Sequence, residues 1–146
     1  MARRAWFGVA IGLALLAVGP LALATGFGGD SPPSRIPVPA KVFGATVEDR
    51  GGTRIRLSRV SWNGEVFVYG VLGLAQVTVP FESIRDATFE DGAEEGERTA
   101  VITTRDGQVV KLTVDDDLMC YGRTEFGNYQ LEVRDLRRIT EIAAEP

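Results

Sequence analysis

The second half of this chain repeats the first at a fixed offset of 52 residues. The dipeptide Tyr69-Gly70 returns as Tyr121-Gly122, and a ladder of apolar residues returns at the same offset. The matched apolar pairs are Val79 and Leu131, Phe81 and Val133, Ile84 and Leu136, and Ala87 and Ile139. Because a fixed offset held by residue type marks a duplicated structural unit, we expect two copies that bury the same face.

The upstream parts of the two copies align at an offset of 55, with residues 51–57 opposite residues 106–112. This change of offset requires a three-residue insertion in copy A between residues 58 and 63, which we expect in a loop. Copy A then spans residues 42–89 and copy B residues 99–146, with an acidic connector at residues 90–98 between them.

Each copy has the pattern of a β-meander, in which alternating apolar residues are separated by turn residues. In copy A we expect strands at 45–49, 53–60, 65–70, 76–81 and 84–89; in copy B, at 100–104, 108–114, 118–121, 128–133 and 136–142. Pro80 cannot donate a ladder hydrogen bond, which predicts an edge strand there. The three-residue step from Phe81 to Ile84 predicts one 3₁₀ turn before the fifth strand. The last segment of copy B also fits a helical face, but its counterpart in copy A favours a strand.

Four strands, a 3₁₀ turn and a fifth strand resemble the SH3-like and Sm-like small barrels, whose closing segment is similar to residues 77–87. Residues 126–133 are similar to a segment of duplicated, uncharacterised bacterial envelope proteins. The resemblance implies a binding or assembly module and transfers no catalytic residue. A unit of about 45 residues buries too little surface to be stable alone. We therefore expect an all-β fold with one core, built either as two fused five-stranded barrels or as one pseudo-twofold sandwich.

The N-terminus has the three parts of a secretory signal. Arg3 and Arg4 are followed by an uncharged apolar run and by a small-x-small site at Ala22 and Ala24, which predicts a signal helix cleaved after residue 24. The alternative is an uncleaved signal anchor that extends to about residue 27. Residues 25–41 are rich in proline and predict an extended linker. Both alternatives export the remaining chain, to the periplasm or outside the cell, with a possible anchor in the inner membrane.

Composition argues against several classes of function. Removal of residues 1–24 leaves 14 basic and 20 acidic residues, a net charge of −6, which disfavours a nucleic-acid partner. The chain has no histidine and one cysteine, Cys120, which we expect to be a small buried hydrophobe. We expect that the protein is not an enzyme. The remaining enzymatic alternative is a carboxylate-based hydrolase that uses Glu65 and Asp117, which occupy equivalent positions in the two copies.

Two constellations are candidate binding sites. Arg54, Arg56 and Arg59 form an outward row with Trp62 at its end, which predicts either a solvated face or a patch for an anionic partner with Trp62 as the stacking anchor. The acidic candidates for a calcium site are Asp115, Asp116, Asp117 and Glu125. The alternative for these acids is that they serve only as turn residues. We interpret the acidic connector as a flexible solvated loop.

The function we expect is an exported, non-catalytic binding or assembly module of the bacterial cell envelope, with a protein or a surface polymer as its partner. The alternatives are a calcium-dependent carbohydrate-binding module, a membrane-anchored periplasmic adaptor and the hydrolase. No cofactor is expected, apart from calcium if the protein is the carbohydrate-binding module. The matched positions of the repeat are apolar residues, glycine and tyrosine, so residues that differ between the copies are better candidates for function.

Overall fold

A computed structural model describes residues 40–146, which fold into ten strands and two 3₁₀ turns. Copy A contains β1 (Phe43–Asp49), β2 (Arg54–Trp62), β3 (Phe67–Leu72), β4 (Ala75–Pro80), η1 (Phe81–Ser83) and β5 (Ile84–Asp91). Copy B contains β6 (Glu97–Thr104), β7 (Val109–Asp115), β8 (Met119–Thr124), β9 (Gly127–Glu132), η2 (Val133–Asp135) and β10 (Leu136–Ala144). The expected order of elements occurs twice, and the last segment of copy B is a strand.

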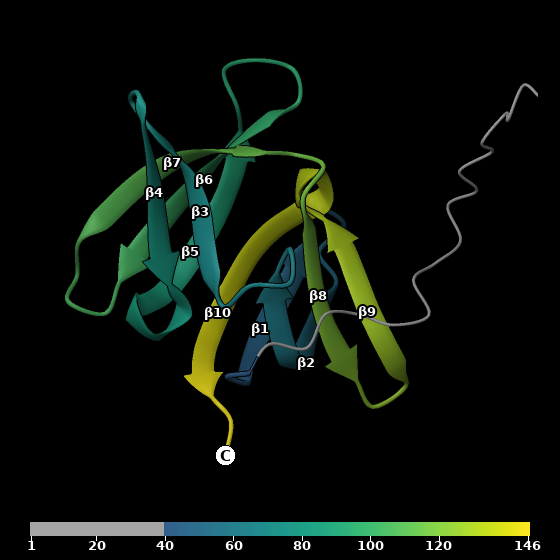
Figure 1. Cartoon of the computed structure of the whole chain (residues 1–146). Coiled ribbons are helices and arrows are strands. Elements are labelled where there is room, and N and C mark those ends of the chain that lie inside the picture. The colour runs from purple at the N-terminus through teal and green to yellow at the C-terminus, as the bar shows by residue number, and fades with distance from the viewer. Residues whose placement is uncertain (1–39) are drawn as a thin grey trace, which may run out of the picture. The chain divides into compact units, whose positions relative to one another are not determined.

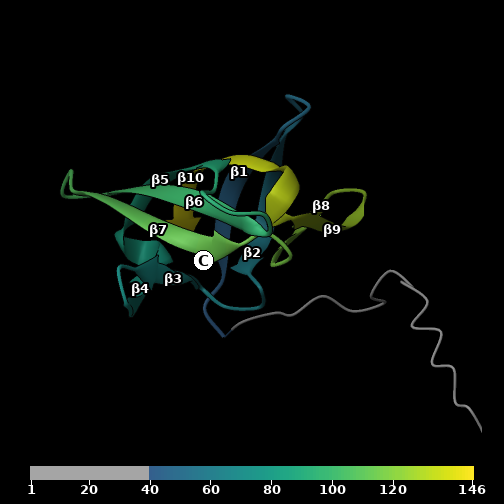
Figure 2. The same cartoon turned by 90° about the horizontal axis from the view of Figure 1, so that it is seen from above.

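All ten strands belong to one antiparallel sheet, ordered β4-β3-β7-β6-β5-β10-β1-β2-β8-β9. The sheet curls on itself in the manner of a half-barrel, as seen from two directions in Figure 1 and Figure 2. The all-β prediction is confirmed. The expectation that Pro80 lies in an edge strand is also confirmed, because β4 forms one end of the sheet.

The two copies exchange strands within this sheet. The pairs β1·β10 and β2·β8 place the first two strands of copy A beside strands of copy B. The pairs β5·β6 and β3·β7 place the first two strands of copy B beside strands of copy A. The sheet therefore has two halves of mixed origin, β4-β3-β7-β6-β5 and β10-β1-β2-β8-β9. Two separate tandem barrels, each made from one copy, are not confirmed.

The repeated Tyr-Gly dipeptide marks the places where the copies cross. Gly70 in β3 lies so close to β7 that a Cβ atom there would come within 2.7 Å of the carbonyl oxygen of Thr113. Gly122 in β8 lies against β2, where a Cβ atom would be 2.7 Å from Cδ1 of Leu57. A residue without a Cβ is needed for such an approach. The strongest feature of the repeat thus has a structural cause.

The core is shared by both copies. Their buried apolar side chains form a single hydrophobic cluster, which agrees with the expectation that neither copy has a sufficient core of its own. Within the cluster, Phe43 of β1 meets Phe81 of η1 edge-on, with the ring centroids 5.7 Å apart.

The sequence predicts that the three-residue insertion of copy A lies in a loop. In the structure it lies only partly in a loop. Part of it is a bulge inside β2, where the pairing with β8 shifts between Ser58 and Ser61 and Arg59 adopts a φ of +50°. A bulge adds a residue to one strand and changes which side chains face inward. This local irregularity decides the position of Trp62, described below.

The acidic connector is largely part of a hairpin. β5 extends to Asp91 and pairs with β6, which begins at Glu97, so only residues 92–96 lie between the two strands. The predicted signal helix, its alternative as an anchor and the proline-rich linker as far as residue 39 lie outside the described residues. Within residues 40–146, no helix is long and apolar enough to cross a membrane.

Candidate functional site

The free edge of β4 carries no charged side chain. Residues 72–80, which include the whole of β4, are uncharged, and in the described part of the chain β4 pairs only with β3. Native sheets usually protect a free edge with charged residues, bulges or proline. Here Pro80, at the end of the strand, is the only such feature. The main-chain N–H and C=O groups on the outer side of β4 are therefore open to another strand.

Large apolar side chains project from the tip of the same hairpin. The exposed fractions are 45% for Val71, 50% for Leu72 and 107% for Leu74, while Gly73 makes the turn with a φ of +63°. This tip and the tip of the β8–β9 hairpin lie on opposite sides of the domain in both views (Figures 1 and 2). Exposed apolar groups that adjoin an open edge are typical of an interaction surface.

The equivalent hairpin of copy B has the same shape but a different surface. Phe126, the counterpart of Leu74, is 87% exposed. Three charged residues of copy B stand where copy A has uncharged ones: Arg123 for Val71, Glu125 for Gly73 and Glu132 for Pro80. Of these three, only Glu132 lies on the edge strand β9, while Arg123 is in β8 and Glu125 is in the turn, so the copy B hairpin is charged where the copy A hairpin is not.

Trp62 is not a surface anchor, and that hypothesis is wrong for this structure. The side chain is fully buried and stacks on Phe89, with ring centroids 5.4 Å apart and an interplanar angle of 17°. Alternation from Leu57 would point residue 62 outward, but the bulge at Arg59 turns Val60 and Trp62 inward. Its indole N–H has no hydrogen-bond acceptor within the described residues.

The arginine row is exposed, but its charges are partly matched. Arg54 lies 3.8 Å from Glu48, and Arg56 lies 3.9 Å from the carboxylate of Glu141 and donates to that residue's carbonyl oxygen at 3.0 Å. The backbone N–H of Arg59 donates to the carboxylate of Glu145. Because β2 lies between β1 and β8, the row does not protect a sheet edge. It is a solvated face in which the guanidinium groups of Arg54 and Arg56 have acidic neighbours.

The acidic candidates for calcium are not brought together. Asp115 ends β7, Asp116 and Asp117 form the following turn, and Glu125 lies beyond the far end of β8. A six-residue strand is about 20 Å long, so Glu125 is well separated from the other three. Asp116 lies 3.7 Å from a guanidinium nitrogen of Arg134. In the described part of the chain, no group of three or more acidic or cysteine side chains could hold a metal ion.

The hydrolase pair has no ordered environment. Glu65 and Asp117 are both exposed, and within residues 40–146 neither carboxylate is held by a hydrogen bond or an ion pair. Cys120 is fully buried, as predicted, and burial raises the pKa of its thiol to about 12. The thiolate needed for nucleophilic attack is therefore disfavoured at neutral pH.

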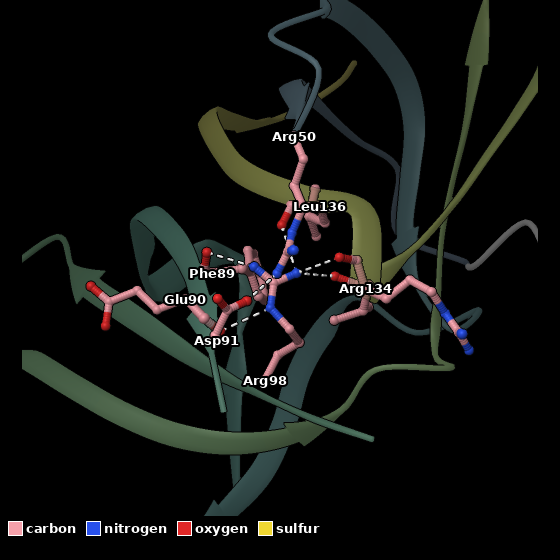
Figure 3. A network of polar contacts seen from close by, with 8 residues as sticks. Arg50, Phe89, Glu90, Asp91, Arg98, Arg134 and Leu136 are labelled. Carbon is pink, nitrogen blue, oxygen red and sulfur yellow. Dashed lines mark hydrogen bonds and ion pairs between the residues drawn. The ribbon is translucent and has the colours of Figure 1, made fainter. Parts of the chain in front are cut away.

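A buried cation, Arg98, was missed by the sequence analysis. Only 4% of this β6 residue is exposed, and its guanidinium donates five hydrogen bonds to main-chain carbonyl groups (Figure 3). The acceptors are Glu90 (2.8 Å) for Nε, Phe89 (2.7 Å) for Nη2, and Val133 (2.7 Å), Arg134 (2.8 Å) and Leu136 (3.1 Å) for Nη1. Arg98 thus joins the end of β5 to η2 and the start of β10.

Arg98 occupies an inward position of β6, followed by the inward residues Ala100 and Ile102. The repeat alignment places Arg98 opposite Phe43. This replacement of an apolar residue by a cation is the sequence signal that could have predicted a buried arginine. Burial lowers the pKa of Arg98, and the nearby charge of Arg50 lowers it further, whereas acidic neighbours led by Asp91 raise it. Five neutral acceptors compensate for the lost hydration.

A protein-family model described as "Uncharacterised protein" matches residues 39–144. The chain belongs to this family. The match identifies no SH3-like or Sm-like family, and neither the curated proteins nor the solved structures gave a match. The family region starts four residues before β1 and ends with the last residue of β10. The match therefore covers all ten strands of the sheet.

Proposed function

We propose that this chain is an exported, non-catalytic binding module of the bacterial cell envelope that holds an extended segment of a partner protein along β4. The observation that carries the proposal is the uncharged edge of β4, with Val71, Leu72 and Leu74 exposed beside it. The assignment of the two sheet halves as SH3-like units belongs to the same proposal. It is supported by the repeated order of four strands, a 3₁₀ turn and a fifth strand.

Strand addition suits this edge better than a side-chain pocket does. An added strand gains affinity from main-chain hydrogen bonds and specificity from alternate side chains. On β4 the side chains of Gln76 and Thr78 are exposed, and neither would repel an approaching backbone. The partner segment should carry an apolar residue opposite Leu74, because that side chain is otherwise fully in water.

Export to the envelope is supported by the basic start, the apolar run and the small-x-small site of residues 1–24. A membrane-anchored adaptor would differ from this proposal only in the fate of that segment. The separation of Glu125 from Asp115, Asp116 and Asp117 gives the calcium-dependent alternative no support.

The test is photo-cross-linking from Thr78 of the full chain in cells, followed by identification of the cross-linked segment. A synthetic peptide with that sequence is then titrated calorimetrically into the purified chain. The variant Val71→Arg places the copy B residue beside the edge, and we expect it to weaken binding at least about tenfold. Phe126→Ser, on the opposite hairpin, is the matched control and should leave binding unchanged.

Three results would contradict the proposal. A cross-link to a second copy of this chain would make β4 a self-assembly edge. A peptide that binds Val71→Arg as tightly as the unaltered chain would place the site elsewhere. Failure of Thr78 to cross-link any protein segment would exclude strand addition in the cell.

A further inference from the structure

The seam between the two halves of the sheet lies on a local pseudo-twofold axis. β5 pairs with β10, and within this pair Ala87 stands opposite Ile139, its own counterpart at the 52-residue offset. These two side chains point into the core and are buried. Their neighbours along the strands therefore face the other side of the sheet.

On that outer side the structure has an open groove with a volume of about 520 Å³. This volume is within the range of sites for small ligands. Its lining surface is polar and apolar in similar parts, and three of the lining residues are arginines. The lining residues are Arg85, Asp86, Thr88, Arg105, Arg138, Thr140, Glu141 and Ile142. We call it the axial groove. Three arginines in one groove are notable because residues 40–146 carry a net charge of −6, from 13 basic and 19 acidic side chains.

The two carboxylates of the axial groove are already engaged. Asp86 pairs with Arg85 at 3.1 Å. Glu141 accepts a hydrogen bond from Thr46 and lies 3.9 Å from Arg56, which is outside the groove. The remaining two arginines of the lining are left without an acidic partner in the groove.

Arg105 is held by neutral groups alone. Its Nε donates to the carbonyl oxygen of Glu82 at 2.9 Å and its Nη2 donates to that of Ile142, which leaves the Nη1 hydrogens free. Arg138 makes no ion pair within the described residues. The axial groove therefore has two guanidinium groups that make no ion pair within residues 40–146, one of them fixed by hydrogen bonds.

The copies differ in residue type at the position of Arg138 and in ion pairing at the position of Arg105. The counterpart of Arg138 is Asp86, and the counterpart of Arg105 is Arg50, whose guanidinium is paired with Asp91. An accidental accumulation of charge through duplication would have produced the same pattern on both sides of the axis. The charge of the groove instead arises from Arg138, where copy A has Asp86, and from the lack at Arg105 of the acidic partner that Arg50 has.

We propose that the axial groove binds a phosphate group, held by the guanidinium groups of Arg105 and Arg138 and by the hydroxyl groups of Thr88 and Thr140. Guanidinium forks match oxyanions in geometry as well as charge. Phosphate offers more acceptor oxygens than a carboxylate and can use all four donor groups. The phosphate comes either from a small soluble compound or from the head group of an anionic lipid.

The test is a titration of the purified full chain with inorganic phosphate, followed by NMR of the backbone amides and arginine side chains. We expect saturable shifts at Thr88, Arg105, Arg138 and Thr140. Arg138→Asp places the copy A residue in the groove and should weaken binding at least about tenfold. Arg137→Asp changes the charge equally on the adjacent residue, which pairs with Glu48 outside the groove, and should weaken binding about twofold or less.

Equal loss of binding in the two variants would show general attraction to positive charge and would overturn the proposal, as would shifts that fail to saturate. Equal saturation by acetate would contradict the choice of phosphate. Arg138→Gln, which keeps the length of the side chain without its charge, repeats the test if Arg138→Asp does not fold. Co-sedimentation with phosphatidylglycerol vesicles, but not phosphatidylcholine vesicles, that depends on Arg138 would assign the phosphate to a lipid. Phosphate binding without such co-sedimentation would assign it to a soluble compound.

Discussion

At the scale of single residues, Arg98 shows how the two copies have diverged while keeping the same backbone. Copy A fills this inward position with Phe43, which packs on Phe81. Copy B fills it with a cation whose guanidinium donates to five carbonyl oxygens in two segments. Polar groups buried in this way are costly to leave unpaired, so the position tolerates few other residues.

Arg98→Ala is expected to lower the free energy of unfolding by about 3 kcal/mol, because carbonyl groups at the end of β5 and in η2 lose their donor. Arg98→Lys keeps the charge but offers fewer donors and should have an intermediate effect. Urea unfolding followed by the fluorescence of buried Trp62 measures both. Arg54→Ala, which removes an exposed guanidinium 3.8 Å from Glu48, should change stability by less than about 0.5 kcal/mol. Equal effects of Arg98→Ala and Arg54→Ala would contradict a structural role for the buried guanidinium.

Trp62 shows why side-chain direction was harder to predict than strand position. The strand that contains it was expected from local alternation, and β2 was found there. One bulged residue, Arg59, reverses the inward and outward faces after it. Nothing in the residue types around Arg59 marks that bulge, although the change of offset from 52 to 55 placed an insertion in this stretch.

At the scale of elements, the strands and 3₁₀ turns could be predicted because their signals are local. The step from Phe81 to Ile84 predicted η1, and Pro80 predicted the edge position of β4. Pairing between copies could not be predicted in this way, because each strand has the same apolar face for either partner. The exchange of strands depends on close approaches such as those at Gly70 and Gly122.

Gly70→Ala is expected to destabilise the fold by about 2 kcal/mol, since the new methyl group would press on the main chain of β7. Gly122→Ala should also be destabilising, because the new methyl group would lie 2.9 Å from Cβ of the buried Leu57, which the main chain of β2 holds in place. Gly51→Ala is the control: the nearest atom is a side-chain oxygen of Asp49 at 3.1 Å, and a change within about 0.5 kcal/mol is expected. Thermal unfolding of the three variants measures the order. An unchanged unfolding temperature in the Gly70→Ala variant would contradict the close approach of β3 and β7.

At the scale of the whole molecule, the exchange of strands decides which part of the chain is a folding unit. A fragment of residues 41–92 contains one sequence repeat, but of the sheet it keeps only the pairs β1·β2 and β3·β4. A fragment of residues 65–117 cuts across the repeat boundary and keeps all four pairs of the half β4-β3-β7-β6-β5. The structural unit therefore differs from the repeat unit in the sequence.

We expect the fragment of residues 65–117 to retain β-structure and slowly exchanging amides, and the fragment of residues 41–92 to be unfolded. The two fragments have similar lengths, close to the lower limit of about 60 residues at which a domain is comfortably stable, so the difference between them reports strand pairing and not size. Circular dichroism and amide hydrogen exchange of both fragments under the same conditions measure it. If residues 41–92 were the better folded fragment, each copy would pair with itself, and the interleaved sheet order would be wrong.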